Sequence, residues 1–212
     1  MSAPSERAVT KRMLDLAITI PLLAILSPLL LLIALAIRLT SPGPVLFRQS
    51  RVGKDNQPFT MLKFRSMVVS APADDDAARQ AIYEELAGTR QAVGASFKLA
   101  ADPRITPIGR VIRATSLDEI TQLFNVVRGE MSLVGPRPAL DWEAEAFPPE
   151  YQRRTEVLPG ITGLWQVSGR SHLSTPQMLQ LDIDYIEQQS LGLDLQILFR
   201  TIPVVLRGDG AR

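Results

Sequence analysis

The chain has 212 residues, enough for one domain of ordinary size and too few for two large ones. Its 23 Lys and Arg residues nearly balance 22 Asp and Glu residues, and the net charge of +1 argues against a nucleic-acid partner. The absence of Cys excludes disulfides, zinc–thiolate sites and a thiol nucleophile. The single His, His172, excludes a site with several His ligands and argues against a histidine-based catalytic triad. Any chemistry must therefore rely on carboxylates, hydroxyls and basic groups.

A long uncharged stretch near the N-terminus predicts a membrane segment. The 22 residues 16–37 carry no charge and are mostly Leu, Ile and Ala. A helix of this length spans roughly 33 Å, the thickness of the hydrocarbon core of a bilayer. Lys11 and Arg12 precede the stretch and Arg38 follows it. Because basic flanks favour the cytoplasmic side, a helical hairpin that enters and returns satisfies both flanks, whereas a straight span does not.

The dipeptide Ser27-Pro28 lies near the centre of this stretch. Proline removes a backbone donor and clashes with the preceding turn, so it bends or breaks a helix. The Ser27 hydroxyl can satisfy a backbone group freed at the bend, which matters at membrane depth. We therefore expect a re-entrant helix broken at Ser27-Pro28; a kinked single-pass anchor is the alternative.

The rest of the chain predicts a mainly α fold with one short β-hairpin. Residues 40–44 form a Pro- and Gly-rich linker, and a turn-rich segment separates two short strands. The predicted elements are strands at 45–49 and 59–64, a peripheral helix within 74–91, a helix at 176–189 capped by Thr175, and a helix at 193–206. The last helix is apolar with flanking Arg residues, which fits either a helix on a membrane surface or one packed against the domain.

Two adjacent acids, Asp118 and Glu119, open a predicted helix whose apolar stripe is Leu117, Ile120, Leu123, Phe124 and Val127. Ser116 and Glu119 have the spacing of a capping box, and Asp118 would then be a surface acid that complements the helix dipole. Arg110 and Arg113 precede the acids, and Arg137 stands between two prolines in Gly135-Pro136-Arg137-Pro138.

Paired acids flanked by arginines beside a membrane segment suit phosphoryl chemistry on a lipid. Arginine binds phosphate oxygens through two parallel hydrogen bonds. One carboxylate could attack phosphorus while the other holds Mg²⁺. The helix N-terminus is expected to keep Asp118 ionised. The Gly-rich segment from Pro159 to Arg170 lacks the order of a Walker loop and could be a structured turn.

These motifs together resemble the bacterial sugar transferases, the monotopic phosphoglycosyl transferases of glycoconjugate assembly. The resemblance runs from about Lys11 to Leu206, and its length is that of the small members that consist of the catalytic core alone. The motifs are Lys11-Arg12-x-x-Asp15, Ser27-Pro28, Lys63-Phe64-Arg65-Ser66-Met67, Ser116-Leu117-Asp118-Glu119, Gly135-Pro136-Arg137-Pro138 and Pro159-Gly160-Ile161-Thr162-Gly163.

The resemblance implies a role for each matching residue. Asp118 would be the nucleophile that forms a phosphosugar-aspartyl intermediate, and Glu119 would bind Mg²⁺. Ser27-Pro28 would break the re-entrant helix. The residues implied in binding substrate or phosphate are Lys63, Arg65, Arg113, Arg137, Gln166 and Arg170.

The same resemblance implies the reaction, the domains and the location. The expected reaction moves a sugar-1-phosphate from a UDP-sugar to undecaprenyl phosphate and releases UMP. Residues 1–40 would form the N-terminal membrane part, and residues 41–212 a catalytic domain with interfacial helices on the cytoplasmic face of the bacterial inner membrane, in contact with its lipids. A homodimer is left open.

Two questions about function stay open at this point. Gly163-Leu164-Trp165-Gln166 departs from the Gly-Trp-Ala-Gln of members that use N-acetylated sugars, which favours a plain hexose over an amino sugar. The alternatives from other classes are a membrane-anchored adaptor that binds anionic lipids and a lipid phosphate hydrolase that uses the same acids.

Overall fold

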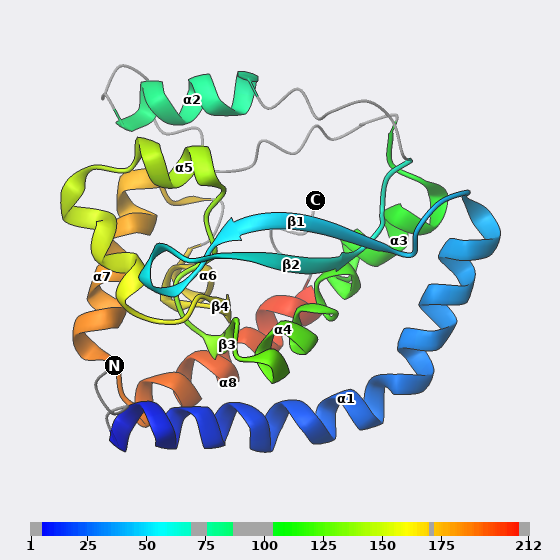
Figure 1. The fold of residues 1–212 in the computed structure, drawn as a ribbon, viewed down its shortest axis with the longest axis horizontal. Helices are drawn as coiled ribbons and strands as arrows, with labels where there is room; N and C mark the ends of the chain where they lie inside the picture. Colours follow the sequence, from blue (N-terminus) through cyan, green and yellow to red (C-terminus); the bar gives the residue numbers. More distant parts are fainter. Residues whose placement is uncertain (1–5, 69–75, 87–103, 170–171, 208–212) are drawn as a thin grey trace.

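The computed structural model describes residues 6–68, 76–86, 104–169 and 172–207. Its fold is mainly helical, as the sequence predicts, and Figure 1 shows one long helix, α1, below and beside the rest of the chain. The helices are α1 (Glu6–Thr40), α2 (Asp76–Leu86), α3 (Pro107–Ala114), α4 (Gln122–Arg128), α5 (Asp141–Ala146), α6 (Leu164–Ser168), α7 (Thr175–Gln188) and α8 (Leu191–Arg207). Three 3-10 helices, η1 (Lys54–Asn56), η2 (Leu117–Glu119) and η3 (Pro149–Glu156), lie between them.

The predicted hairpin is confirmed and crosses the middle of the molecule (Figure 1). Strands β1 (Leu46–Val52) and β2 (Pro58–Phe64) pair antiparallel, and β1 extends three residues beyond the predicted strand. A second pair, β3 (Ser132–Val134) and β4 (Gly160–Thr162), is parallel and was not predicted. Strands of three residues are too short to show an alternating pattern.

Helix α1 is continuous through Ser27-Pro28 but changes direction along its length (Figure 1). Pro28 lacks the amide that would donate to the carbonyl of Ala24, four residues earlier. The Ser27 hydroxyl donates to that same Ala24 oxygen across 2.8 Å. The predicted compensation is therefore confirmed, and the expected break is a bend within one helix.

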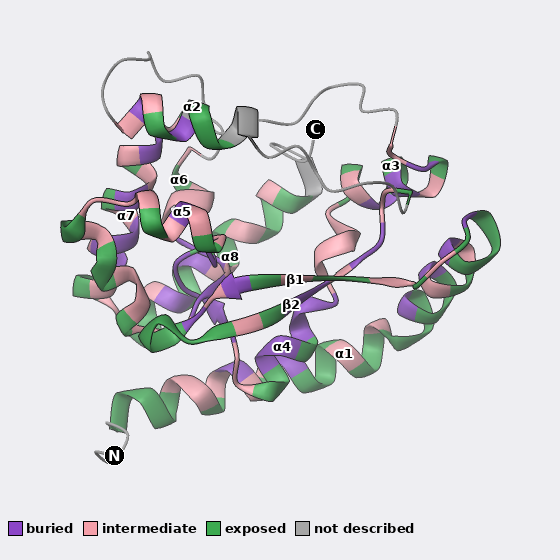
Figure 2. Cartoon of the chain, turned by 45° about the horizontal axis from the view of Figure 1, so that its top comes forward, coloured by how far each residue is buried: buried purple, intermediate pink, exposed green. Residues whose placement is uncertain are grey.

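Most of α1 faces away from the protein. By length and composition it is the one helix in the described ranges that could cross a membrane, and Figure 2 shows exposed residues along its outer side. Its buried positions are few and widely spaced: Asp15, Thr19, Leu30, Ile33 and Ile37. Apolar residues exposed in this number are expected to contact lipid or a partner.

Both ends of α1 are attached to the same core. At its start, Lys11 pairs with Asp194 of α8 at 2.8 Å, and Arg12 donates to Val127 of α4 at 2.8 Å. Asp15 accepts the amide of Leu133 at 3.1 Å. At its end, Leu30, Ile33 and Ile37 pack with Phe64 of β2 and Ile112 of α3. The Lys-Arg-x-x-Asp motif thus fixes the start of the helix to α8, α4 and β3.

Two predictions near the C-terminus need correction or extension. Helix α7 begins at Thr175, and its cap is Ser174, whose hydroxyl accepts the Gln177 amide; Thr175 is wrong as the cap by one residue. The amide and hydroxyl of Thr175 instead donate to buried Glu85 of α2. Helix α8 packs Ile197 into the core and leaves Phe199 exposed, so it has one packed apolar face and one outward apolar face.

Candidate active site

The paired acids lie in a short turn rather than at the start of an α-helix. Asp118 and Glu119 belong to η2, between α3 and α4, and Ser116 before them has φ = 56°. The predicted capping box is wrong, because Ser116 is left-handed and its side chain makes no capping bond. A capping residue needs extended backbone for its oxygen to meet the helix amides. Glu119 therefore does not take part in a capping box.

The predicted apolar stripe of this segment also needs correction. Leu123 and Val126 are the buried apolar residues of α4, whereas Phe124 and Val127 are each 40% exposed. The register differs from the prediction because the α-helix begins at Gln122, after the separate turn of η2. In this register Asp118 and Glu119 stay partly exposed, while α4 packs against β2.

Glu119 is paired with Lys63 of the hairpin. The Lys63 ammonium lies 2.8 Å from Glu119 Oε1, and both side chains are partly exposed. The backbone around them is held by α4: Thr121 donates to the Leu62 carbonyl at 2.9 Å, and Asn125 accepts the Leu62 amide at 3.1 Å. The structure thus brings Lys63 and the acids together across 56 residues of sequence.

Asp118 lies in a more buried environment than the sequence predicts. Burial raises the pKa of Asp118, and the neighbouring Glu119 raises it further, while Lys63 and Arg113 lower it. The predicted helix dipole is absent because η2 has only three residues. The charges of Lys63 and Arg113, rather than a helix dipole, therefore favour the ionised form of Asp118.

Arg113 is placed by the packing of α3. Its helix is capped by Thr106, whose hydroxyl accepts the Gly109 amide at 2.9 Å and whose own amide donates to the Ser66 carbonyl at 3.0 Å. A Cβ on Gly109 would lie 1.9 Å from the Ser66 oxygen. Any larger residue at position 109 would push α3, and with it Arg113, away from the strand.

Arg65 is a structural residue. Its guanidinium is buried and donates to the Ser41 carbonyl at 2.8 Å, to the Ser41 hydroxyl at 2.7 Å, and to the Pro42 carbonyl. These bonds fasten the end of β2 to the linker that follows α1. The Arg65 guanidinium, which the sequence predicts to bind phosphate, thus donates its hydrogen bonds to Ser41 and Pro42 in this structure.

Arg137 lies at the other end of the hairpin. Its Pro-Arg-Pro turn is attached there by hydrogen bonds from the Arg51 guanidinium to the Pro138 carbonyl (3.1 Å) and from the Val52 amide to the Ala139 carbonyl (2.9 Å). Arg51 is paired with Phe59, four residues before Lys63, which is about 14 Å along the strand. Because side chains alternate and paired residues share a face, Arg51 and Lys63 lie on the same face of the hairpin. This face connects the acids with the Arg137 turn.

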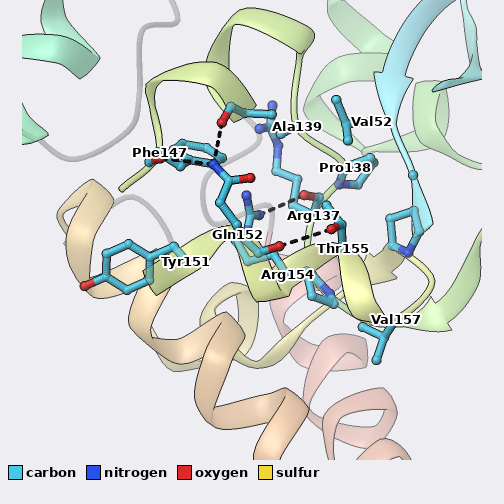
Figure 3. Close-up of a pocket in the computed structure, with 14 residues that line it drawn as sticks. Val52, Arg137, Pro138, Ala139, Phe147, Tyr151, Gln152, Arg154, Thr155 and Val157 are labelled. Atoms are coloured by element: carbon cyan, nitrogen blue, oxygen red, sulfur yellow. Dashed lines mark hydrogen bonds between the residues drawn. The ribbon is translucent and has the colours of Figure 1, made fainter. Parts of the chain in front are cut away.

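A shallow hollow of about 360 Å³, counting space open to solvent, lies beside Arg137 (Figure 3). Arg154 on its wall donates to the Arg137 carbonyl at 3.0 Å and lies over the Phe147 ring at 4.9 Å. Arg154 also pairs with buried Asp182 of α7 at 2.7 Å. Burial raises the pKa of Asp182 to about 6, although Arg154 and Arg137 oppose the shift.

Of the two remaining predicted residues, the structure describes Gln166. The Gln166 amide donates to the Ile161 carbonyl at 3.2 Å, within the Gly-rich segment that forms β4 and α6. Arg170 lies outside the described residues. Within the described ranges, no group of three or more His, Cys, Asp or Glu side chains could hold a metal ion.

Comparison with known proteins decides the family. The model of the bacterial sugar transferase family matches residues 6–208, nearly the whole chain. The chain belongs to the bacterial sugar transferase family. The match includes the membrane helix α1, the hairpin, the acids of η2 and the C-terminal helix α8.

Several curated relatives of this sugar transferase cover almost all of it. A UDP-glucose:undecaprenyl-phosphate glucose-1-phosphate transferase of Caulobacter vibrioides is 44% identical over 95% of this chain and 71% of its own. An undecaprenyl-phosphate galactose phosphotransferase of Salmonella typhimurium is 41% identical over 95% of this chain and 41% of its own. The exopolysaccharide production protein ExoY of Sinorhizobium fredii is 39% identical over 96% and 88%. The chain thus spans less than half of some relatives and most of others.

Three residues of this sugar transferase's site region were missed from sequence: Glu143, Arg154 and Asp182. Glu143 is buried, accepts the Leu140 amide at 2.7 Å, and lies 3.5 Å from both Arg51 and Arg137. All three stand in ordinary polar helical segments, where a charged residue usually faces water. The sequence carries no signal that separates them from their exposed neighbours.

Proposed function

We propose that this chain transfers a sugar-1-phosphate from a UDP-sugar to undecaprenyl phosphate and releases UMP. The observation that carries the proposal is the cluster of Asp118 and Glu119 with the cations Lys63 and Arg113 beside a helix suited to a membrane. The names of the Caulobacter and Salmonella relatives support the same reaction class. An adaptor that only binds lipid would not need two adjacent acids held beside two cations.

Asp118 is the nucleophile in this proposal. Its carboxylate oxygen attacks the phosphorus that carries the sugar, a bond forms between Asp118 and phosphorus, and the bond to UMP breaks. An oxygen of undecaprenyl phosphate then attacks the same phosphorus, which returns Asp118 to the carboxylate and yields the lipid-linked diphosphate sugar. Lys63 and Arg113 support both steps, because they favour the ionised form of Asp118 and offset the phosphate charge.

The acids fit Mg²⁺ in the mode that this ion prefers. Mg²⁺ is usually held by one or two carboxylates, with substrate phosphates and water completing the shell. Glu119 and Asp118 supply two adjacent carboxylates, and no third acidic or His ligand stands with them in the described ranges. Glu119 is the proposed ligand, and a bound Mg²⁺ would neutralise phosphate charge.

The sugar is proposed to be a plain hexose. Glucose and galactose appear in the names of the Caulobacter and Salmonella relatives. The Leu164-Trp165-Gln166 sequence, which departs from the pattern of members that use N-acetylated sugars, supports the same choice. An N-acetylated amino sugar is the alternative substrate.

The membrane helix is proposed to be re-entrant, with the catalytic part on the cytoplasmic face of the bacterial inner membrane. The attachment of both ends of α1 to one core supports this: Lys11 binds α8, and Ile37 packs against β2 and α3. A helix that crossed the bilayer would place its two ends on opposite sides. The change of direction along α1 (Figure 1), the missing amide of Pro28 inside it and the basic flanks support the same path.

The test is a screen of UDP-sugars for UMP release, with and without undecaprenyl phosphate. Transfer predicts a lipid-linked diphosphate sugar and UMP in equal amounts, with UDP-glucose or UDP-galactose as the best donor. Release of inorganic phosphate or free sugar would indicate a hydrolase. If no donor released a nucleotide, the result would favour the alternative function of a lipid-binding adaptor.

A further inference from the structure

The carboxylate proposed to hold Mg²⁺ is already paired with a cation of the protein. Lys63 and Glu119 meet at 2.8 Å, and their side chains are 24% and 41% exposed. We propose that Lys63 is an internal counter-ion that occupies Glu119 in the metal-free protein, is displaced when Mg²⁺ and the nucleotide sugar bind, and then holds a phosphate oxygen of the substrate. The inference rests on the proposed function and adds an exchange of cations at Glu119.

Two cations of the protein act on the acids before any substrate arrives. Asp118 and Glu119 contribute two negative charges, and Lys63 and Arg113, which both act on Asp118, contribute two positive ones. Mg²⁺ with a diphosphate adds no net charge. A pairing between Lys63 and substrate phosphate would therefore replace its pairing with Glu119 without leaving either charge unmatched.

Lys63 and Mg²⁺ compete for the same ligand. The Lys63 ammonium lies at hydrogen-bond distance from Oε1, one of the two Glu119 oxygens that a metal could bind at about 2.0–2.1 Å, and the two cations repel each other. Among the described residues, no cluster of three or more acidic, His or Cys side chains offers the metal another place. A metal bound at Oε1 of Glu119 therefore requires Lys63 to move.

Lys63 can move without disturbing the fold. Its backbone is fixed in β2 opposite Phe47, but its ammonium ends a flexible four-carbon chain that is partly exposed. The same ammonium already acts on the charge of Asp118. A small rotation away from Glu119 thus keeps it near the nucleophile, where the transferred phosphate must lie.

The experiment measures binding of Mn²⁺ alone, a substitute for Mg²⁺ with the same preference for oxygen ligands, by electron paramagnetic resonance of the free ion. Lys63→Met removes the competitor and should bind Mn²⁺ about fivefold more tightly, since exposed ion pairs are worth up to roughly that factor. Glu119→Gln should lose the site. Arg113→Met is the matched control: it removes a charge near Asp118, and a gain as large as that of Lys63→Met would mean a general field effect and overturn the exchange.

A second measurement uses the wild-type chain, so it does not depend on how the variants fold. The rate at which an amine-reactive ester labels Lys63 is followed by peptide mass spectrometry, with exposed Lys54 of η1 as the internal reference. Mn²⁺ should raise the labelling of Lys63 relative to Lys54. Unchanged labelling at saturating Mn²⁺, or weaker Mn²⁺ binding by Lys63→Met, would overturn the inference. Both measurements are made without nucleotide or lipid, so failure of the proposed transfer reaction would show separately, in the UMP screen.

Discussion

Arg154 joins a buried carboxylate to the Pro-Arg-Pro turn: its guanidinium pairs with Asp182 at 2.7 Å and donates to the Arg137 carbonyl at 3.0 Å. Asp182 is almost fully buried, and Arg154 is its ion-pair partner on η3. The pair connects α7, η3 and the segment after β3. Arg137 is thus held through its backbone, and its partly exposed guanidinium lies 3.5 Å from the Glu143 carboxylate.

The pH dependence of stability tests this buried pair. Burial raises the pKa of Asp182 from 3.8 to about 6, so between these values the folded chain binds more protons than the unfolded chain. Stability from this group therefore falls as the pH rises from about 4 to about 6. The Asp182→Asn variant has no ionisable group at this position. The difference in unfolding midpoint between the wild type and this variant should therefore shrink as the pH rises from about 4 to about 6. An advantage that grows with pH would mean that Arg154 outweighs burial.

Arg137→Lys tests the proposed anion site. Lysine keeps the charge but loses the two parallel hydrogen bonds that arginine offers to a phosphate. Charge-assisted bonds are worth about 1.5–3 kcal/mol each, so kcat/KM for UMP release should fall at least about tenfold. Arg153→Lys is the control, because Arg153 is exposed and pairs with Glu156 and Glu187. Near wild-type turnover in the Arg137→Lys variant would mean that Arg137 shapes the turn and does not bind the phosphate.

Asn125 is predicted to be a main support of the acid turn. Its side chain accepts the Leu62 amide and donates to the Thr60 carbonyl at 2.7 Å. Asn125→Ala removes both bonds, and the buried Leu62 amide left without its partner costs about 1–3 kcal/mol. A clear fall in the unfolding midpoint is expected, with a fall in UMP release. Phe124→Ala, at the exposed neighbour, should change the midpoint much less; equal losses would contradict the assignment.

The topology of α1 can be tested with single cysteines, since the chain has none. Cysteines placed at Ser2 and at exposed Arg48 should both react with an impermeant thiol reagent only from the cytoplasmic side. Pro28→Ala restores the amide that can donate to Ala24, so the straighter helix should shift part of the chain toward a spanning path. Labelling of the cysteine at position 2 from the periplasmic side in the wild-type background would rule out the re-entrant path.

The sequence predicted those features that depend on local pattern. The turn-rich segment between two short strand-like runs placed the hairpin, and the backbone group freed near Pro28 placed the Ser27 hydroxyl. The sequence did not predict local conformations and side-chain partners that depend on contacts between distant segments. Ser116 adopts a left-handed conformation that the capping-box spacing cannot reveal, and Arg65 is drawn into the linker by carbonyls far from it along the chain. The burial that raises the pKa of Asp118 likewise comes from packing, which a helix-dipole argument does not include.

The central claim is that Asp118 becomes covalently attached to the phosphosugar before the lipid reacts. The most direct measurement is mass spectrometry of the chain mixed with Mg²⁺ and the best UDP-sugar in the absence of lipid. We predict a burst of up to one UMP per site and one hexose phosphate on the tryptic peptide 114–128, with fragmentation placing it on Asp118 rather than Glu119. Asp118→Asn should abolish the burst and the adduct, while Glu119→Gln should slow both. Absence of any adduct without lipid, together with intersecting rather than parallel double-reciprocal plots, would contradict the account.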